Sequence, residues 1–281
     1  MKKTLTVLVL ALATFGFQVS TAQAGFEIQG AMTIPLKATP ADIAVSQDGK
    51  WTFVLTTDGK IQILNRGGKL AQTIESEGNY DRVEFAPGNR LILSSSKGKV
   101  IKVVFLDIIH TFDTTGSPFK GSENAPVAIT VFNDFQCPYC ARLAPLLDQV
   151  LDKYPTQVKV VFKNFPLQNH KYSIKAATAA LAAGKQGRFW EFHDLLFKNY
   201  NRLDDGKITG FARNLNLDMK RFEKDRASME ITGIIKRDIR EGRDAGVRGT
   251  PTIFINGKLL QVRSMDSFSR AIDLEVKKNS H

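Results

Sequence analysis

The chain has 281 residues, which is long enough for two modest domains. Its 39 Lys and Arg against 28 Asp and Glu give a formal net charge of +11. The basic residues are spread over both halves and form no basic-aromatic motif, so we interpret the charge as a solvated surface and expect no nucleic-acid partner.

The N-terminus has the features of a secretory signal peptide. Met1-Lys2-Lys3 is followed by a short apolar run over 5–17 and by Ala22-Gln23-Ala24, an A-x-A cleavage pattern. A membrane anchor is the alternative, but the run is short for a spanning helix, and no later segment is long and apolar enough. We therefore expect residues 1–24 to be removed and the mature protein to be soluble, exported and, in a bacterium, periplasmic.

Residues 25–110 are expected to form a β-rich domain. Short runs of alternating or β-branched residues are separated by turns that contain Gly, which is typical of consecutive antiparallel strands. The expected strands are 31–36, 42–45, 51–55, 60–64, 70–74, 82–85, 91–94 and 100–106.

This β region repeats itself. Asp42–Gly49 returns loosely as Arg82–Gly88, and Asp58–Ile61 returns as Lys97–Val100, at a period of about 40 residues. Such a period is typical of a four-stranded blade, and the two units resemble blades of WD40-type or YVTN-type propellers, although the WD dipeptide is absent. Two blades cannot close a propeller, which takes at least about four. The domain is therefore either a self-contained sandwich or is completed by other protomers, and we expect a homo-oligomer.

A linker rich in Gly, Ser and Pro follows, and a second domain is expected over 111–281, with a first edge strand near 109–112. The later patterns predict a strand at 127–132, an amphipathic helix over about 138–151, a strand at 158–162, a helical block over 175–245, strands at 252–255 and 259–262, and a helix at 267–277. This order predicts an α/β thioredoxin-like core with an inserted helical block.

The only two cysteines of the chain lie where the strand at 127–132 passes into the first helix of this domain. Cys137 falls near the helix N-cap, where unpaired backbone N–H groups and the helix dipole favour a thiolate and lower its pKa. Cys140 follows one turn later and can form a disulfide with it. Pro138 suits the first helical turn, and together with Tyr139 it fills the space between the sulfurs.

Two other interpretations of the cysteine pair are weaker. A zinc site usually needs four ligands, and the chain has no second CxxC and no paired histidines, so no metal is expected. A structural disulfide that closes so short a loop would restrain little entropy of the unfolded chain. The pair is therefore interpreted as a redox-active dithiol that needs no other cofactor.

Four groups of residues together resemble the DsbA family of exported thiol-disulfide oxidoreductases, over about 112–277. They are Phe132–Cys140; Phe165-Pro166-Leu167 with His170; Gln186-Gly187 with Phe189-Trp190; and Gly246–Thr252 with Ile255-Asn256-Gly257. The resemblance implies that Cys137 is the nucleophile and Cys140 resolves the mixed disulfide. It also implies a cis-proline loop at Pro251, where Thr250 would offer backbone groups to an extended substrate. A Thr before this proline resembles the isomerases and more reducing relatives.

The family commonly carries a buried acid six residues before the first cysteine, and this chain has Val131 there. Asp134 and Lys163, both near strand ends, are the candidates to replace that proton relay, or each is an ordinary surface charge. His170 is either a ligand or an acid or, as we favour, a capping or structural residue.

The expected function is that of a thiol-disulfide oxidoreductase acting on unfolded or misfolded exported proteins, with a membrane redox partner. An isomerase or reductase is favoured over a monomeric oxidase, because an added domain that oligomerises is typical of the former. A different class is a Cu(I)-binding or chaperone module that uses the two soft thiolates for binding.

Overall fold

The computed structural model describes residues 27 and 29–278. The expected signal peptide, residues 1–24, lies outside the described residues. The described chain forms two compact units, one made of residues up to 83 with 95–98 and the other of residues 84–94 with 99 onward. This division passes through the sheet of residues 82–105, and the domain boundary at 110/111 stays a prediction.

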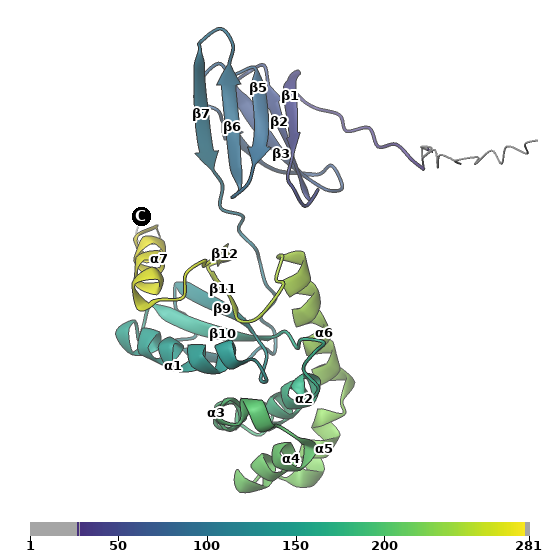
Figure 1. The fold of residues 1–281 in the computed structure, drawn as a ribbon, viewed down its shortest axis with the longest axis vertical. Coiled ribbons are helices and arrows are strands. Elements are labelled where there is room, and N and C mark those ends of the chain that lie inside the picture. Colours follow the sequence, from purple (N-terminus) through teal and green to yellow (C-terminus); the bar gives the residue numbers. More distant parts are fainter. Residues whose placement is uncertain (1–26, 28, 279–281) are drawn as a thin grey trace, which may run out of the picture. The chain divides into compact units, whose positions relative to one another are not determined.

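The β region contains two antiparallel meanders (Figure 1). The first has four strands in sequence order: β1 (Pro40–Val45), β2 (Trp51–Thr56), β3 (Lys60–Asn65) and β4 (Leu70–Glu75). The second has three: β5 (Arg82–Ala86), β6 (Arg90–Ser95) and β7 (Val100–Phe105). Neither sheet is a closed barrel. Gly49, Gly59 and Gly68 have φ of 66°, 82° and 73°, which is the backbone conformation that these hairpin turns require.

The prediction of a strand at 31–36 is wrong, because no described residues of this segment are in a strand. Its alternating pattern is that of a strand, but a strand forms only beside a partner that accepts its backbone hydrogen bonds, and none of the described strands pairs with this segment. The segment lies against the β3–β4 turn instead, where a Cβ added to Gly68 would be 2.7 Å from the Ile34 side chain.

The second domain is built on a five-stranded sheet of order β12-β11-β9-β10-β8. The strands are β8 (Phe119–Gly121), β9 (Val127–Asn133), β10 (Val158–Asn164), β11 (Thr252–Ile255) and β12 (Lys258–Leu259). Only β9 and β10 are parallel, and α1 (Pro138–Lys153) connects them. Pro145 lies inside α1 and has no N–H, so the helix lacks the hydrogen bond to the Ala141 carbonyl.

The edge strand expected at 109–112 is not present, and β8 is the edge strand beside β10 instead. Residues 109–112 are held by other contacts. The His110 amide donates to the Gly257 carbonyl at 2.9 Å, and the Phe112 ring packs edge-on against Phe132 and Phe254 at 5.2 and 5.0 Å. The apolar pattern of this segment therefore reflects packing against the sheet rather than pairing with it.

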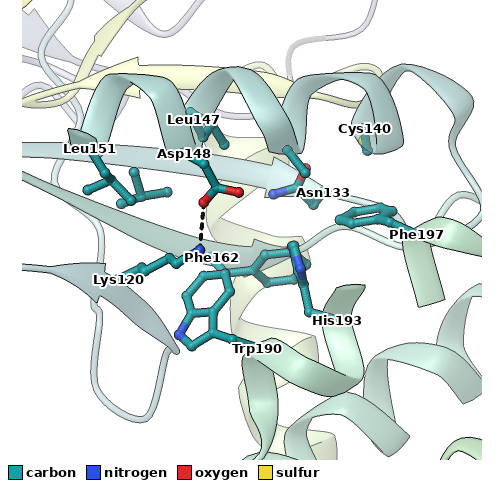
Figure 2. A pocket seen from close by; sticks show the side chains of 12 residues that line it. Lys120, Asn133, Cys140, Leu147, Asp148, Leu151, Phe162, Trp190, His193 and Phe197 are labelled. Carbon is teal, nitrogen blue, oxygen red and sulfur yellow. Dashed lines mark hydrogen bonds and ion pairs between the residues drawn. The ribbon is translucent and has the colours of Figure 1, made fainter. Parts of the chain in front are cut away.

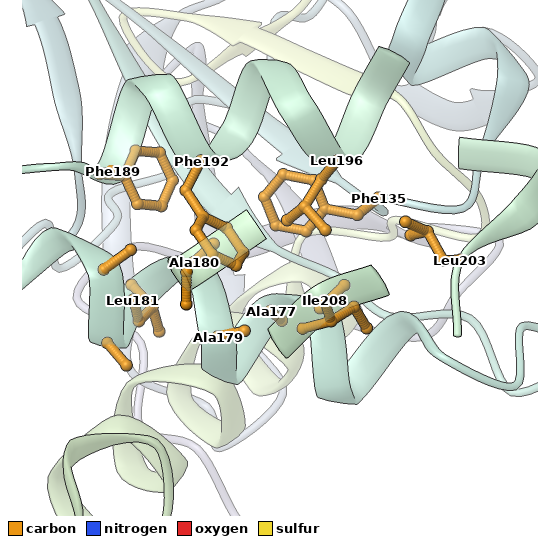
Figure 3. Close-up of a cluster of buried hydrophobic side chains, with 14 of the residues drawn as sticks. Phe135, Ala177, Ala179, Ala180, Leu181, Phe189, Phe192, Leu196, Leu203 and Ile208 are labelled. Atoms are coloured by element: carbon orange, nitrogen blue, oxygen red, sulfur yellow. The ribbon is translucent and has the colours of Figure 1, made fainter. Parts of the chain in front are cut away.

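The helical block is inserted between β10 and β11. It contains α2 (Ser173–Gly184), α3 (Phe189–Lys198), a 3₁₀ turn (Tyr200–Arg202), α4 (Asp205–Asn214), α5 (Met219–Arg226) and α6 (Met229–Asp244), and α7 (Met265–Lys278) follows β12. The side chains of Asp204, Asp218 and Ser228 cap α4, α5 and α6 by accepting from the backbone N–H three residues on. The alanines of α2 let the helix pack closely under α3, as Figure 3 shows around Phe192 and Leu196.

The two faces of the central sheet are packed differently. Val131, Phe162 and Ile253 lie at equivalent register positions, so they share one face. Val131 and Ile253 pack with α1 and α7, whereas Phe162 packs in the cluster that holds both cysteines. The alternate residues Phe132 and Phe254 share the opposite face with Phe165. The cysteines and the α6 side of the sheet are therefore on separate faces.

Candidate active site

Cys137 lies at the end of α1 where the helix begins. It is the N-cap residue, with φ −79° and ψ 120°, and Pro138 opens the helix. Its carbonyl accepts from the amides of Cys140 and Ala141, both at 3.1 Å, while its own amide donates to the Asp134 carbonyl at 3.0 Å. Cys137 as a whole residue is 3% exposed. Its sulfur points toward the Thr250 carbonyl, to which the protonated thiol donates at 3.2 Å.

The two thiols differ sharply in acidity. The hydrogen bond from Cys140 lowers the pKa of Cys137 to about 5, assisted by the nearby Thr250 side chain and by the N–H groups of the first turn, and against the effect of burial. Burial raises the pKa of Cys140 far above its ordinary value, and the hydrogen bond to Cys137 raises it further. Cys140 is 1% exposed. At neutral pH the pair therefore consists of one thiolate and one thiol.

The loop before β11 lies against the cysteines. The Thr250–Pro251 peptide bond is cis, as the motif resemblance implied. Thr250 places its carbonyl against Cys137 Sγ, and its hydroxyl is buried with no hydrogen-bond partner among the described residues. A buried donor without a partner beside an acidic thiol is available to a thiolate.

Tyr139 is the exposed residue of the motif. Its side chain is 58% exposed, and the Arg142 guanidinium lies over its ring at 4.7 Å. Pro138 and Tyr139 therefore contribute accessible surface beside Cys137, and Arg142 adds positive charge to that surface.

Asp134 is buried, and both of its carboxylate oxygens have hydrogen-bond partners. One carboxylate oxygen accepts from the Gln136 amide at 2.7 Å, and the other accepts from the Leu167 amide at 2.7 Å and lies 2.9 Å from His170 Nδ1. These bonds join the loop that carries Cys137 to the loop after β10. Asp134 is thus close to the cysteines along the chain, and its part in a proton relay stays a prediction.

Lys163 does not lie with the cysteines. Its register partner is Phe132, so its side chain is on the sheet face opposite Phe162. There its ammonium is fully buried, contacts Asp238 and Glu241 at 3.0 Å each, and donates to the Asp113 carbonyl. Burial raises the pKa of Asp238, against the attraction of Lys163. Lys163 is therefore part of a buried ionic cluster, and the sheet separates its ammonium from the two cysteines.

A small space beside Cys140 contains residues that the sequence did not single out. Its volume is about 20 Å³, which is room for a single water. Figure 2 shows Asn133, Phe162, His193 and Phe197 around it, with the Lys120–Asp148 ion pair of 2.6 Å at one side. No local signal in the sequence marks the proximity of His193 to Cys140.

Two kinds of feature are absent from the described part of the chain. No group of three or more His, Cys, Asp and Glu residues within 27 and 29–278 is arranged to hold a metal ion. Likewise, no helix in these ranges is long and apolar enough to cross a membrane.

This arrangement, an acidic N-cap cysteine, a buried partner thiol and a cis-proline loop on a five-stranded sheet, defines a thiol-disulfide oxidoreductase of the thioredoxin type. The family model described as thioredoxin matches residues 113–274, more than half of the chain. The chain belongs to the thioredoxin family, and its second domain is DsbA-like in carrying the inserted helical block.

Solved structures agree with this assignment. A thioredoxin-like oxidoreductase from Silicibacter pomeroyi is 26% identical, with a TM-score of 0.52, over 58% of this chain and 93% of that one. ScsC of Proteus mirabilis is 26% identical, with a TM-score of 0.52, over 59% and 74%. BdbD of Bacillus subtilis, 23% identical over 61% and 98% with a TM-score of 0.53, is similar in fold.

The curated relatives have a different description. Na(+)/H(+) antiporter NhaA 3 of Salinispora tropica is 35% identical over 170 residues, which are 60% of this chain and 25% of that protein. The NhaA antiporter of Herminiimonas arsenicoxydans is 30% identical over 142 residues, which are 50% and 22%. The chain thus spans about a quarter of the length of these relatives, and their names describe the whole proteins.

Proposed function

We propose that this protein is a periplasmic thiol-disulfide isomerase or reductase that acts on unfolded or misfolded exported proteins. The observation that carries the proposal is the lowered pKa of Cys137, about 5, at the N-cap of α1 and beside the buried thiol of Cys140. A thiolate is the attacking species in thiol-disulfide exchange, and this site maintains one at neutral pH.

The reaction proceeds by two exchanges. The Cys137 thiolate attacks one sulfur of a client disulfide, so that a mixed disulfide forms and the other client sulfur leaves as a thiolate. In reduction, Cys140 loses its proton to that departing thiolate and attacks Cys137, which releases the client dithiol and leaves a Cys137–Cys140 disulfide. In isomerisation, a second client thiol attacks the mixed disulfide and restores the Cys137 thiolate, with no net change of redox state.

Thr250 and Pro251 would position the client. The Thr250 carbonyl lies against Cys137, so an extended client segment placed along this loop brings its disulfide to the nucleophile. Pro138 and Tyr139 form the other side of the approach. The Thr250 hydroxyl would donate to the thiolate after client release.

The acidity of Cys137 supports an isomerase or reductase over the strongest oxidases. The pKa of about 5 falls between about 3.5 for DsbA and about 7 for thioredoxin, and a less stabilised thiolate gives a less oxidising disulfide. A reducing membrane partner is then needed to return the Cys137–Cys140 disulfide to the dithiol. The export signal expected at 1–24 supports the periplasmic location.

The test compares three activities of the purified protein. We expect the reduced form to restore activity to scrambled ribonuclease and to reduce insulin, and we expect Cys137→Ala to do neither. Cys140→Ala is the matched control, because it removes the other buried thiol and retains the nucleophile, so it should lose insulin reduction and keep isomerisation. Efficient oxidation of reduced ribonuclease without isomerisation would instead identify a monomeric-type oxidase, and tightly bound copper with no thiol exchange would identify the metal-binding class.

A further inference from the structure

The two meanders are related by a fixed offset of 40 residues. β3 begins at Lys60 and ends at Asn65, and β7 begins at Val100 and ends at Phe105. With the same offset, Ala71-Gln72-Thr73-Ile74 of β4 matches Ala31-Met32-Thr33-Ile34. The segment 31–34, which is unpaired in the described chain, is therefore the repeat equivalent of β4.

The second meander lacks the corresponding strand. β4 lies beside β3 at the end of the first sheet, whereas β7 is the last strand of its sheet in the described chain, as Figure 1 shows. The offset places the missing strand at 110–115. Those residues are held elsewhere: the His110 amide bonds to Gly257, and Asp113 is engaged by Lys163, Arg237 and Glu241. Within residues 29–278, the chain thus has a strand-like segment without a sheet and a sheet without its fourth strand.

The face of β7 is apolar and uncovered. Ile101, Val103 and Phe105 alternate onto one face and are 68%, 41% and 76% exposed. Ile61, the repeat equivalent of Ile101, is 0% exposed. A long apolar edge strand pairs with other chains unless it is covered, so this sheet needs a partner.

We propose that residues 31–36 of a second copy of this chain pair with β7 and complete the three-stranded sheet. The 40-residue repeat identifies the segment that would fill the position beside β7, because residues 31–34 match β4 at that offset. Pro35 falls near the end of the segment, where it removes one ladder hydrogen bond at most. Two copies that exchange these segments would have four four-stranded sheets, which is the smallest number of blades in typical propellers.

The first meander sets the register. In the β3–β4 pair, Ile61 lies opposite Ile74, Gln62 opposite Thr73 and Ile63 opposite Gln72. Shifted by the repeat offset, the pairing places Ile101 opposite Ile34 and Val103 opposite Met32. Met32 and Val103 are both exposed in the single chain, so cysteines can be placed there without disturbing a core.

The test is a disulfide between these two positions. The protein carries Met32→Cys and Val103→Cys with Cys137 and Cys140 replaced by Ala, and it is oxidised with diamide at micromolar concentration. We expect covalent dimers or larger closed species on a non-reducing gel, because each disulfide joins two chains. Lys37→Cys with Val103→Cys is the matched control, since Lys37 is also exposed but is five residues out of register.

The readout is mass, so it is independent of the proposed enzymatic function. A crosslink within one chain, seen as a monomer with no free thiol, would mean that the chain's own segment fills the position and would overturn the proposal. Equal crosslinking of the two variants, or a monomeric wild-type protein by light scattering, would overturn it as well. Circular dichroism spectra of both variants are compared with that of the wild-type protein, and a variant that has lost its fold is excluded from the comparison of crosslinking.

Discussion

The central sheet carries a buried polar centre on each face, and the two centres are built in opposite ways. On the α6 face, Lys163, Asp238 and Glu241 neutralise one another, and Asp238 also accepts from the Asn164 amide at 2.9 Å. On the other face, the Cys137 thiolate has only weak or partial donors, and the Thr250 hydroxyl beside it has no partner in the described chain. Satisfied groups hold a fold in place, whereas incompletely satisfied groups leave chemistry available.

Removing a sulfur gives the largest expected effect. Cys137→Ser should lower the rate of thiol exchange about a thousandfold or more, because the nucleophile is lost. Cys140→Ser should instead accumulate mixed disulfides with clients, since the resolving thiol is absent. Non-reducing gels of both variants measure this, and equal trapping by the two would contradict the assignment of Cys137 as the attacking residue.

Disrupting the cluster of Lys163, Asp238 and Glu241 should lower the free energy of unfolding and leave the rate of thiol exchange unchanged. Lys163→Met leaves Asp238 buried, so the free energy of unfolding should fall by about 3 kcal/mol, at the low end for a broken buried pair. The low end is expected because Arg237 remains 3.5 Å from Asp238. Urea unfolding measures the loss. The pKa of Cys137 should not move, and the double variant Lys163→Met/Asp238→Leu should recover stability.

The pH dependence of stability should distinguish the reduced from the oxidised protein. The pKa of Cys137 is lowered from 9.0 to about 5 on folding, so the thiolate stabilises the reduced form fully near pH 9, and this stabilisation is lost as pH falls through about 5. The oxidised form has no such group. Urea unfolding of both forms at pH 4.5, 7 and 9 should show the stability of the reduced form rising relative to the oxidised form. A constant difference would exclude a thiolate at neutral pH.

The Thr250 hydroxyl should contribute the smallest effect. Thr250→Val keeps the shape and removes the donor, so the pKa of Cys137 should rise by up to about one unit, the value of a single hydrogen bond. Absorbance at 240 nm against pH, in a Cys140→Ala background, gives the pKa. Thr250→Ser is the control that retains the hydroxyl.

The active site was predictable because its signals are local or belong to a motif. Cys137 and Pro138 identify a helix N-terminus by themselves, and the Gly246–Thr252 motif identified the loop that contacts them across more than 100 residues. Lys163 was misplaced since its partners, Asp238 and Glu241, are on a helix about 75 residues later and no periodicity links them. The strand at 31–36 failed for a related reason: alternation describes a strand, but pairing depends on a neighbour.

Short or distant features were the ones missed. β8 is three residues long and ends at Gly121, whose φ is 100°, so no hydrophobic pattern marks it. His193 lines the space beside Cys140 only because α3 packs under the sheet. In both cases the information is in the packing of distant segments, which a single sequence does not display.

Pro145 has a consequence for the redox cycle. It removes one rung from the hydrogen-bond ladder of α1, one turn after Cys140, so the first turn of the helix is coupled to the rest by fewer bonds. The first turn, which carries Cys140, is therefore the part of α1 that can adjust with the loss of the fewest hydrogen bonds when the two sulfurs join or separate.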